Sequence, residues 1–517
     1  MTLDQVRRQL PAGALADRVA VLAGPAEDIP VGDGVRVVDA TQTLPALHAA
    51  LTVDGPYDLV VDLGGGPGLA ERLSQLLFHV RPGGVWAARV PQDAGPFLSH
   101  LEALRVRHPG GGGTPAERDA DALAASIVGV ERCEDVVHVR TAADALPKLT
   151  HRQVHRLRRR LSGEVTSLFE REGFDWDVAA PAASTAEDWP VPTSYQAPPL
   201  SLRAYPEAQC WPRQGVVTAR FVAPESSQRL GAGRLHNPSF TDLSPRFVER
   251  PPVPRERLEG AWFHLDNQFR GHFGHALSEQ VSLLWAWPRV LEEHPDARAL
   301  VFDNRGNDTV AEWELQLLEA GGVDRDRVHL VRGPVVVERL LAASPMFSRP
   351  AHLHPELRST YDRIGAALAA AATPSVESHE RIFLTRRGRR GCHNLDQVEA
   401  EAERLGYTIV VPETLPLPEQ VRLVREADVI AGLAGSNIFQ IAFAGEPKRV
   451  VLVGSASYPA HNEFMMSALM GHSLTHVAGT PDVPAPPSGF SLRAFHSDFA
   501  IDFAREGVAL REALAGD

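Results

Sequence analysis

Short apolar runs and amphipathic stretches alternate along residues 381–455, which is the most regular pattern in the chain. The apolar runs predict strands at 381–387, 407–413, 428–435 and 449–455, and the stretches between them predict helices at 395–406, 418–427 and 437–445. Gly406 suits the end of the first helix, and Pro418 suits the first turn of the second. Strands that alternate with helices in this way predict a Rossmann-like parallel sheet.

The same alternation predicts two further α/β segments. Residues 1–145 contain apolar runs at 18–24, 35–40, 57–64 and 81–91, with helical stretches between them, and are expected to form a doubly wound domain. Residues 214–375 form a less regular α/β segment that ends in a helix from Pro355 to Ala372. The last residues, 499–514, are amphipathic and are expected to pack back onto a domain as a helix.

Two stretches separate the N-terminal domain from the rest. Residues 146–172 predict one long basic helix, because Val154, Leu157, Leu161 and Val165 recur at helical spacing among arginines. We prefer a helix packed on a neighbouring domain, and contact with anionic lipid is the alternative. Residues 174–213 are rich in proline without a period and are expected to be a linker. The predicted domains are therefore 1–145, 146–213, 214–375 and 376–517.

Composition restricts the class of protein. The formal net charge of −13 argues against nonspecific binding to nucleic acid, which needs a basic surface. Three cysteines (Cys133, Cys210 and Cys392) lie far apart and suggest neither a disulfide framework nor a zinc ribbon. Neither a signal peptide nor a membrane-spanning run is recognised. We expect a cytoplasmic protein, with peripheral contact at the inner face of the membrane left open and the oligomeric state undetermined.

A first candidate site lies in the segment NQFRGHFGHALSEQ, residues 267–280. His272, His275 and Glu279 are spaced so that a helix would place all three on one face. A histidine hydrogen-bonded to a carboxylate is suited to general-base catalysis, and the same residue types can bind a metal. A buried pair without a function is the alternative, and no further metal ligands are visible nearby.

A second candidate site follows the strands of the segment 381–455. Arg386 and Arg387 come at the end of the first strand, where α/β sheets bind ligands, and a guanidinium group can fork onto a diphosphate. The backbone N–H groups of Gly435, Ser436 and Asn437, between a strand and a helix, can bind a phosphate. Glu463 follows the next strand and suits either ribose hydroxyl groups or the start of a helix.

The N-terminal domain contains the glycine-rich segment DLGGGPG at residues 62–68. The segment follows the third predicted strand and does not have the spacing that dinucleotides or S-adenosylmethionine require. Together with RPGGVW at 81–86 it looks like half of a class I methyltransferase sheet. A degenerate domain without a cofactor is preferred over an active methyltransferase.

The order of motifs across residues 210–480 resembles glycosyltransferase family 61. The matching features are the helix motif with Asn267, Gly271, His272, Phe273 and Glu279, the strand end FLTRR, the run from Gly406 to Gly432, the Gly435-Ser436 turn and the NEF segment at 462–464. The resemblance implies an inverting enzyme that uses a nucleotide sugar and has a two-lobed GT-B architecture. The implied fold class is α/β: a pair of Rossmann-type lobes preceded by an additional doubly wound domain.

The resemblance also implies which lobe binds the donor and which lobe holds the acceptor. The C-terminal lobe would bind the nucleotide sugar through Arg386, with Arg387 and Ser436 assisting, and the preceding lobe would hold a hydroxyl acceptor beside His275 or Glu279. Such folds replace a metal with positive side chains, so we expect no divalent cation to be required and predict no cofactor. Cell-surface polysaccharide is the acceptor class suggested by analogy alone.

One departure from the family pattern leaves a second hypothesis open. A histidine commonly stands in the turn that here contains Ala434, and an asparagine farther along is replaced by Gln440. A non-catalytic scaffold that binds a nucleotide or sugar is therefore the main alternative to the enzyme. An active methyltransferase fused to the transferase is the third.

Overall fold

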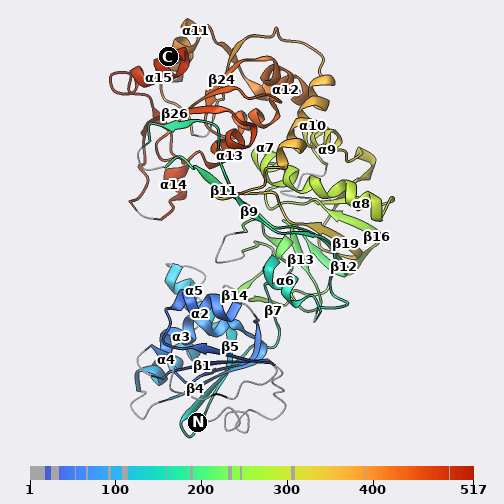
Figure 1. Ribbon diagram of the computed structural model, residues 1–517, viewed down its shortest axis with the longest axis vertical. Coiled ribbons are helices and arrows are strands. Elements are labelled where there is room, and N and C mark those ends of the chain that lie inside the picture. The colour runs from blue at the N-terminus through green and yellow to red at the C-terminus, as the bar shows by residue number, and fades with distance from the viewer. Residues whose placement is uncertain are drawn as a thin grey trace.

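Three α/β units follow one another along the chain in the computed structural model (Figure 1). The structure describes residues 18–24, 29, 34–52, 54–65, 68–90, 95–107, 115–159, 161–186, 190–230, 236–244, 247–303, 309–388, 390–487 and 489–516. Residues 66 and 67 of the N-terminal glycine segment and Arg160 of the basic stretch lie outside these ranges. The α/β fold class with an additional N-terminal domain is confirmed.

The N-terminal unit is a six-stranded sheet in the order β2-β1-β3-β4-β6-β5. Its first four strands are parallel, and β6 runs antiparallel to both of its neighbours. The strands are β1 (Val19–Ala23), β2 (Val35–Asp39), β3 (Tyr57–Asp62), β4 (Val80–Arg89), β5 (Ile127–Cys133) and β6 (Val136–Thr141). The helices are α2 (Leu44–Thr52), α3 (Leu69–Leu76), η1 (Leu77–His79), α4 (Gly95–Arg105) and α5 (Pro115–Ser126). Apolar strand residues point to both faces and enter two separate core clusters.

The prediction of one long helix over 146–172 is wrong. Among the described residues of this segment, only α6 (His151–Leu157) is helical, and it begins with a capping box at Thr150. Gly163 has a φ of 87°, which ends helical geometry, and β8 (Thr166–Arg171) then pairs with β12. The apolar residues of the segment nevertheless pack against the neighbouring lobe in one cluster, which confirms the preferred placement: Leu149, Val154, Leu157, Leu161 and Val165.

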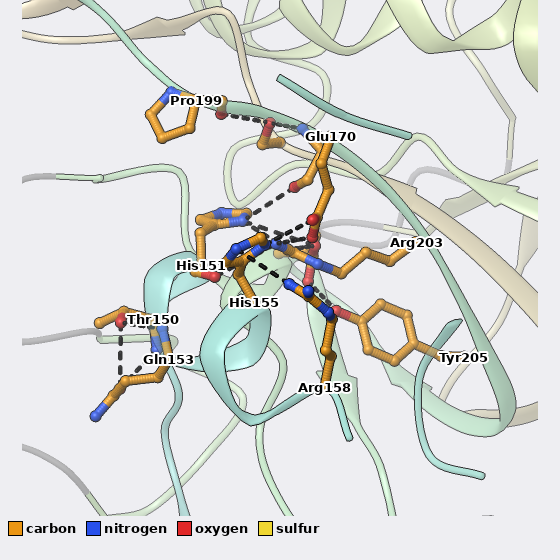
Figure 2. A network of polar contacts seen from close by, with 12 residues as sticks. Thr150, His151, Gln153, His155, Arg158, Glu170, Pro199, Arg203 and Tyr205 are labelled. Atoms are coloured by element: carbon orange, nitrogen blue, oxygen red, sulfur yellow. Dashed lines mark hydrogen bonds and ion pairs between the residues drawn. The ribbon is translucent and has the colours of Figure 1, made fainter. Parts of the chain in front are cut away.

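A buried polar network fastens α6 to the middle lobe (Figure 2). Arg203 Nη1 donates to Glu225 Oε1 over 2.8 Å, and the Tyr205 hydroxyl donates to Glu225 Oε2 over 2.7 Å. Burial alone would raise the pKa of Glu225, but the Arg203 guanidinium overcomes this effect and the net pKa is lowered. Burial lowers the pKa of His151, which lies 2.8 Å from Arg203 Nη1, to about 4. The network therefore joins a neutral imidazole to a buried ion pair.

The prediction that residues 174–213 form a linker is also wrong. This segment contains β9 (Phe174–Asp177), β10 (Ala182–Ser184), β11 (Ser194–Ala197) and β12 (Leu200–Trp211). β10 pairs in parallel with β26 of the C-terminal lobe, whereas β11 pairs with β9 and with β21 of the middle lobe. Because the partners lie far away in the sequence, the local pattern does not reveal these strands.

The middle lobe has a mixed sheet in the order β13-β12-β19-β16-β17-β18. β19, β16, β17 and β18 are parallel, and β12 is antiparallel to β19, β13 and β8. The new strands are β13 (Gly215–Val217), β16 (Glu256–His264), β17 (Arg298–Phe302), β18 (Val328–Val331) and β19 (Val335–Ala343). Two small sheets contain β7 (Ala145–Pro147), β14 (Asp242–Ser244), β15 (Phe247–Glu249), β20 (Phe347–Ser348) and β21 (His352–Leu353).

Helices of the middle lobe follow the strands of its sheet. They are η2 (Pro224–Ser226), α7 (Phe273–His275), η3 (Ala276–Gln280), η4 (Val281–Ala286), α8 (Trp287–Glu293), α9 (Glu312–Ala320), η5 (Arg325–Arg327) and α10 (Leu357–Ala370). The predicted helix from Pro355 to Ala372 is confirmed as α10.

The C-terminal lobe has a parallel sheet in the order β10-β26-β25-β24-β22-β23, to which β27 adds antiparallel. Its strands are β22 (Arg381–Leu384), β23 (Thr408–Val410), β24 (Val429–Leu433), β25 (Arg449–Ser455), β26 (Ser473–Pro481) and β27 (Phe499–Ala500). Its helices are α11 (Leu395–Arg404), η6 (Pro412–Thr414), α12 (Leu417–Glu426), η7 (Ser436–Phe443), α13 (His461–Met470), α14 (Leu492–Phe495) and α15 (Gly507–Ala515).

The strand and helix order predicted for 381–455 is confirmed. Gly406, with a φ of 82°, follows α11, and Pro418 lies in the first turn of α12. Two details differ. η7 is a 3₁₀ helix buried from Asn437 to Phe443, so packing rather than helical propensity decides its form. The predicted helix over 499–514 begins with the short strand β27 and becomes helical only at Gly507.

The middle and C-terminal lobes share one hydrophobic core. Leu277 of η3, Tyr361 of α10 and Phe439 of η7 belong to the same buried cluster. Figure 1 shows α7, α10 and α13 where the two lobes meet. No helix in the described ranges combines the length and apolar character needed to cross a membrane.

Candidate functional site

The segment that carries the two histidines changes helical type twice. α7 is a single α-helical turn, η3 is a π-helical turn, and η4 is 3₁₀. Single π-helical turns inside helices occur frequently at functional sites because they displace side chains from regular spacing. Glu279 lies within the π turn.

His275 and Glu279 form the predicted pair. His275 Nδ1 lies 2.8 Å from Glu279 Oε1, and the Phe269 ring stacks on the imidazole with a centroid distance of 4.3 Å. The second oxygen, Glu279 Oε2, is buried and has no hydrogen-bond partner among the described residues. A carboxylate oriented through one oxygen, with its other oxygen unpaired, is suited to accept a proton.

His272 does not lie on the helical face that its spacing predicts. It precedes α7 in extended backbone, with φ −105° and ψ 115°. Its ring still meets the His275 ring edge to face, with centroids 4.9 Å apart. His272 therefore contacts the pair from outside the helix. Within the described ranges, no group of three or more His, Cys, Asp and Glu side chains is placed to hold a metal ion.

The glycine turn after β24 lies at the point where the order of the C-terminal sheet reverses. β22 pairs with β23 on one side and with β24 on the other, and ligands of α/β sheets bind outside such points. Gly435 has a φ of 138°, and a Cβ there would lie 2.9 Å from Arg390 Nη2 and 3.5 Å from Arg386 Cζ. The turn thus needs glycine for its backbone and for the close approach of Arg390.

Gly435, Ser436 and Asn437, the residues predicted for this turn, differ in their hydrogen bonds. The Gly435 N–H donates to Glu463 Oε1 over 2.8 Å, so it is directed away from any phosphate. In the described part of the chain, the N–H groups of Ser436 and Asn437 donate no hydrogen bond to the protein. Asn437 Nδ2 donates to the Leu384 carbonyl oxygen over 3.1 Å, which ties the turn to the end of β22.

Glu463 is fully buried beneath the turn. Besides the Gly435 N–H it accepts a hydrogen bond from the Tyr458 hydroxyl, at 3.1 and 3.2 Å from its two oxygens. Burial raises the pKa of Glu463. Its observed contacts hold the turn, and its side chain has no exposed surface.

Two guanidinium groups face the turn. Arg386 Nη2 donates to the carbonyl oxygens of Ala434, at 3.0 Å, and Arg390, at 3.1 Å. The Arg390 Cζ lies 4.3 Å from the centroid of the Tyr458 ring, and Arg390 Nη1 is buried without a hydrogen-bond partner among the described residues. Burial, together with the Arg390 charge, lowers the pKa of Arg386 to about 10. Two cations held this closely favour an anion between them.

Arg387 lies elsewhere. It forks onto Glu399 of α11 with distances of 2.8 and 2.9 Å, and this contact raises the pKa of Arg387. The sequence identifies the arginine cluster but not the importance of Arg390. Its left-handed backbone, with φ 55°, and its contact with Tyr458 turn it toward Gly435. Arg390 therefore lies beside the glycine turn, whereas Arg387 is bound to Glu399.

An open groove of about 590 Å³ adjoins the arginines. It is lined by Arg386, Arg387, Gly388 and residues 391–397, which lead into α11. This volume is within the usual range for small-molecule sites.

The two halves of the candidate site touch each other. A Cβ on Gly274 of α7 would lie 2.7 Å from Ser436 Cβ and 3.0 Å from the Phe439 ring. The absence of a side chain at Gly274 therefore lets α7 pack directly on the glycine turn. Burial, with the charge of Arg349 from the middle lobe, lowers the pKa of His461 at the start of α13. The acid–base segment and the cationic turn thus meet at the junction of the lobes.

The glycine segment of the N-terminal unit is arranged differently. Arg72 donates to both oxygens of the buried Asp62, at 2.7 and 3.1 Å, and to the Gly65 carbonyl oxygen at 2.8 Å. A Cβ on Gly64 would lie 3.3 Å from Arg72 Nη2. The protein's own arginine therefore covers the described part of this segment.

Residues 273–451 match the family model described as Glycosyltransferase 61. The match begins at α7 and ends within β25, so it contains His275, Glu279, both arginines and the glycine turn. Among curated proteins no match was found.

Parts of the chain are also similar to solved structures. The methyltransferase MycE from the mycinamycin biosynthetic pathway, in complex with Mg and SAH, is 21% identical over 24% of this chain and 41% of its own, with a TM-score of 0.19. TibC from enterotoxigenic E. coli H10407, a bacterial iron-containing dodecameric glycosyltransferase, is 14% identical over 44% of this chain and 71% of its own, with a TM-score of 0.22. A TibC heptosyltransferase structure in complex with ADP-D-beta-D-heptose is 12% identical over 50% and 77%, with a TM-score of 0.21.

These structural likenesses are too weak to support a function, and the chain spans less than half the length of MycE. The family match is the stronger finding, because it covers the middle of the segment that carries the predicted resemblance, from Phe273 to β25. The motif residues Asn267, Gly271 and His272 and the segment 462–464 lie outside the match. Residues 273–451 of this chain are therefore similar to the glycosyltransferase 61 family.

Proposed function

We propose that this protein is an inverting glycosyltransferase that moves a sugar from a nucleotide-sugar donor to a hydroxyl acceptor. Residues 376–517 would form the donor lobe and residues 214–375 the acceptor lobe. The observation that supports the proposal best is the contact between α7 and the glycine turn, because it brings Glu279 and His275 to the lobe that carries Arg386 and Arg390.

The donor diphosphate would lie against Arg386 and Arg390. The N–H groups of Ser436 and Asn437, at the start of η7, would complete the anion site. Charge develops on the leaving diphosphate as its bond to the sugar breaks, and preorganised cations stabilise that charge most strongly. Arg387 would contribute little, because Glu399 already neutralises it.

Glu279 Oε2 is the proposed base. It would take the proton of the acceptor hydroxyl while the hydroxyl oxygen attacks the anomeric carbon and the bond to the diphosphate oxygen breaks. His275, held to Glu279 Oε1, would keep the carboxylate in position. Attack on the face opposite the leaving group inverts the configuration of the anomeric carbon.

The acceptor class, the cellular location and the lack of a metal requirement are proposed as well. Polysaccharide of the cell surface is the acceptor class we retain, and the cytoplasm, with peripheral membrane contact left open, is the location. That no metal or cofactor is required rests on the two arginines supplying positive charge at the diphosphate. The first test is incubation with a panel of nucleotide sugars and glycan acceptors. Glycosylated product with inverted anomeric configuration by NMR is expected, and failure across a broad panel would contradict the proposal.

A non-catalytic binding protein is the second candidate, favoured by Ala434 in the turn. Ala434 offers only its backbone carbonyl, which Arg386 already engages. Under this hypothesis the protein binds the nucleotide but neither transfers nor hydrolyses the sugar. Replacement of Ala434 by histidine separates the two, since a gain of turnover from zero would identify a decayed enzyme.

A further inference from the structure

The segment from Arg270 to Gln280 carries His272, His275 and Glu279, yet its own backbone is irregular. Its helical type changes at Ala276 and again at Val281. Each change alters the hydrogen-bond spacing, so regular helical bonding does not by itself fix the direction of Glu279. The surrounding protein must hold this segment.

Glu314 of α9 contacts both ends of the segment. It is 0% exposed. Its Oε2 accepts a hydrogen bond from Arg270 Nη1 over 3.1 Å, and its Oε1 accepts one from Gln280 Nε2 over 3.1 Å. Arg270 lies two residues before His272, and Gln280 directly follows Glu279. One carboxylate therefore spans the whole candidate acid–base segment.

Further bonds close this arrangement into a ring. Arg270 Nε donates to the Phe302 carbonyl oxygen at the end of β17, and Gln280 Nε2 donates to the Leu265 carbonyl oxygen over 3.0 Å. Asp266 accepts from the Phe302 N–H over 3.1 Å. The loop before α7, the end of β17, α9 and η3 are thus tied together through buried polar groups.

We propose that Glu314 is a positioning residue that holds Glu279 and His275 in their reactive arrangement. The proposal deepens the proposed function and rests on it. Arg270 and Gln280 are both donors, and a carboxylate offers an acceptor oxygen to each. A glutamine at 314 keeps the size of the side chain but turns an N–H₂ group toward one of these donors, so one end of the clamp is released.

The test compares Glu314→Gln with Glu312→Gln. Glu312 lies on the same helix but pairs with Arg325 at the surface, so it is the matched control. We expect Glu314→Gln to lower kcat about 10-fold to 100-fold while nucleotide affinity changes less than about 2-fold. We expect the control to keep wild-type values. Equal kinetics for both variants would overturn the proposal.

A double-mutant cycle with Glu279→Gln asks whether Glu314 acts through Glu279. If it does, Glu314→Gln lowers kcat strongly in the wild type but about 2-fold or less when Glu279→Gln is already present. Losses that multiply in the double variant would show an independent, general structural effect and contradict the proposal.

A spectroscopic measurement keeps the inference testable even if the protein proves not to be a transferase. NMR of ¹⁵N-labelled histidine reports the His275–Glu279 bond, with Glu279→Gln providing the reference for its loss. Glu314→Gln should move the His275 signal toward that reference, and an unmoved signal contradicts the clamp. If Glu314→Gln does not fold, Gln280→Met removes one end of the ring at similar volume and should move the same signal.

Discussion

Two doubly wound sheets in this protein each have a glycine turn where the strand order reverses. The two turns differ in what their neighbouring arginines contact. In the N-terminal unit, the turn after β3 is covered by Arg72, which pairs with the buried Asp62. In the C-terminal lobe, Arg386 donates to backbone carbonyl oxygens and Arg390 lies over the ring of Tyr458. The comparison teaches that the groups that contact the arginines beside a glycine turn decide whether that turn is a candidate anion site.

The carboxylates beside the two turns show the same difference. Asp62 accepts hydrogen bonds from Arg72, a cation that crosses the turn, and from the Gly64 N–H of the turn. Glu463 also accepts from a turn N–H, that of Gly435, but its second donor is the Tyr458 hydroxyl, so it holds the backbone and the aromatic ring under Arg390. Asp62 therefore neutralises the arginine beside its turn, whereas Glu463 holds the tyrosine ring over which Arg390 lies.

The largest expected effect comes from the acid–base segment that packs on the C-terminal turn. Glu279→Gln should lower turnover by about 10² to 10⁴, the usual contribution of a general base, and leave nucleotide affinity unchanged. Single-turnover kinetics measures the first and calorimetry the second. An N-terminal variant at Asp62 serves as the control, and near-normal turnover in Glu279→Gln would exclude this residue as the base.

Arg72→Met removes the arginine that covers the N-terminal glycine turn. It leaves the carboxylate of Asp62 buried without its cation, which should lower the free energy of unfolding of this unit by about 3 kcal/mol. Denaturant unfolding followed by a probe in the N-terminal unit measures the loss. Nucleotide affinity should not change, and a nucleotide affinity that falls with Arg72→Met would show that the N-terminal turn takes part in donor binding.

Arg390→Ala and Arg387→Ala test which arginine near the C-terminal glycine turn binds the diphosphate. A charge-assisted hydrogen bond contributes about 1.5 to 3 kcal/mol, so Arg390→Ala should weaken nucleoside diphosphate binding about 10-fold to 100-fold. Arg387→Ala is the matched control, because that side chain is held by Glu399. The reverse order of effects in a calorimetric titration would contradict the assignment of Arg390.

The smallest expected effect concerns Asp266, in the scaffold that supports the acid–base segment. Burial raises the pKa of Asp266 to about 7. The folded protein therefore keeps this proton to a higher pH than the unfolded chain, and the stability it contributes is full below about pH 4 and is lost as pH rises through about 7. Between pH 5 and pH 7 this loss is about 2 kcal/mol, at about 1.4 kcal/mol per pKa unit.

Asp266→Asn removes the titration, so its unfolding free energy should lack this decline even if its overall stability is lower. Denaturant unfolding at several pH values measures the slope. A slope equal to that of the wild type would show that another group titrates.

Local patterns predicted β22, β23, β24 and β25 of the C-terminal sheet, because each of these strands pairs with a neighbour that lies close in the chain. They did not predict β26 or β27. They failed at 174–213, where β10 completes a sheet whose other strands begin about two hundred residues later. They also failed at 146–172, since apolar spacing alone does not show that Thr166–Arg171 pairs with β12.

The candidate site was predictable to a similar extent. The spacing of His275 and Glu279 predicted their contact, because a helical turn brings residues four apart together. The choice of Arg390 over Arg387 depends on a left-handed backbone and an aromatic ring from a distant segment. Glu314 lies on a separate helix, and no local pattern links it to the acid–base segment.

The central claim is that the C-terminal turn is the donor site, and calorimetric titration of nucleoside diphosphates into the wild-type protein, Arg386→Ala and Arg72→Met tests it most directly. The account predicts selective binding that Arg386→Ala weakens at least about 10-fold and Arg72→Met leaves intact. Binding that survives in Arg386→Ala but is lost in Arg72→Met would place the nucleotide in the N-terminal unit and contradict the account.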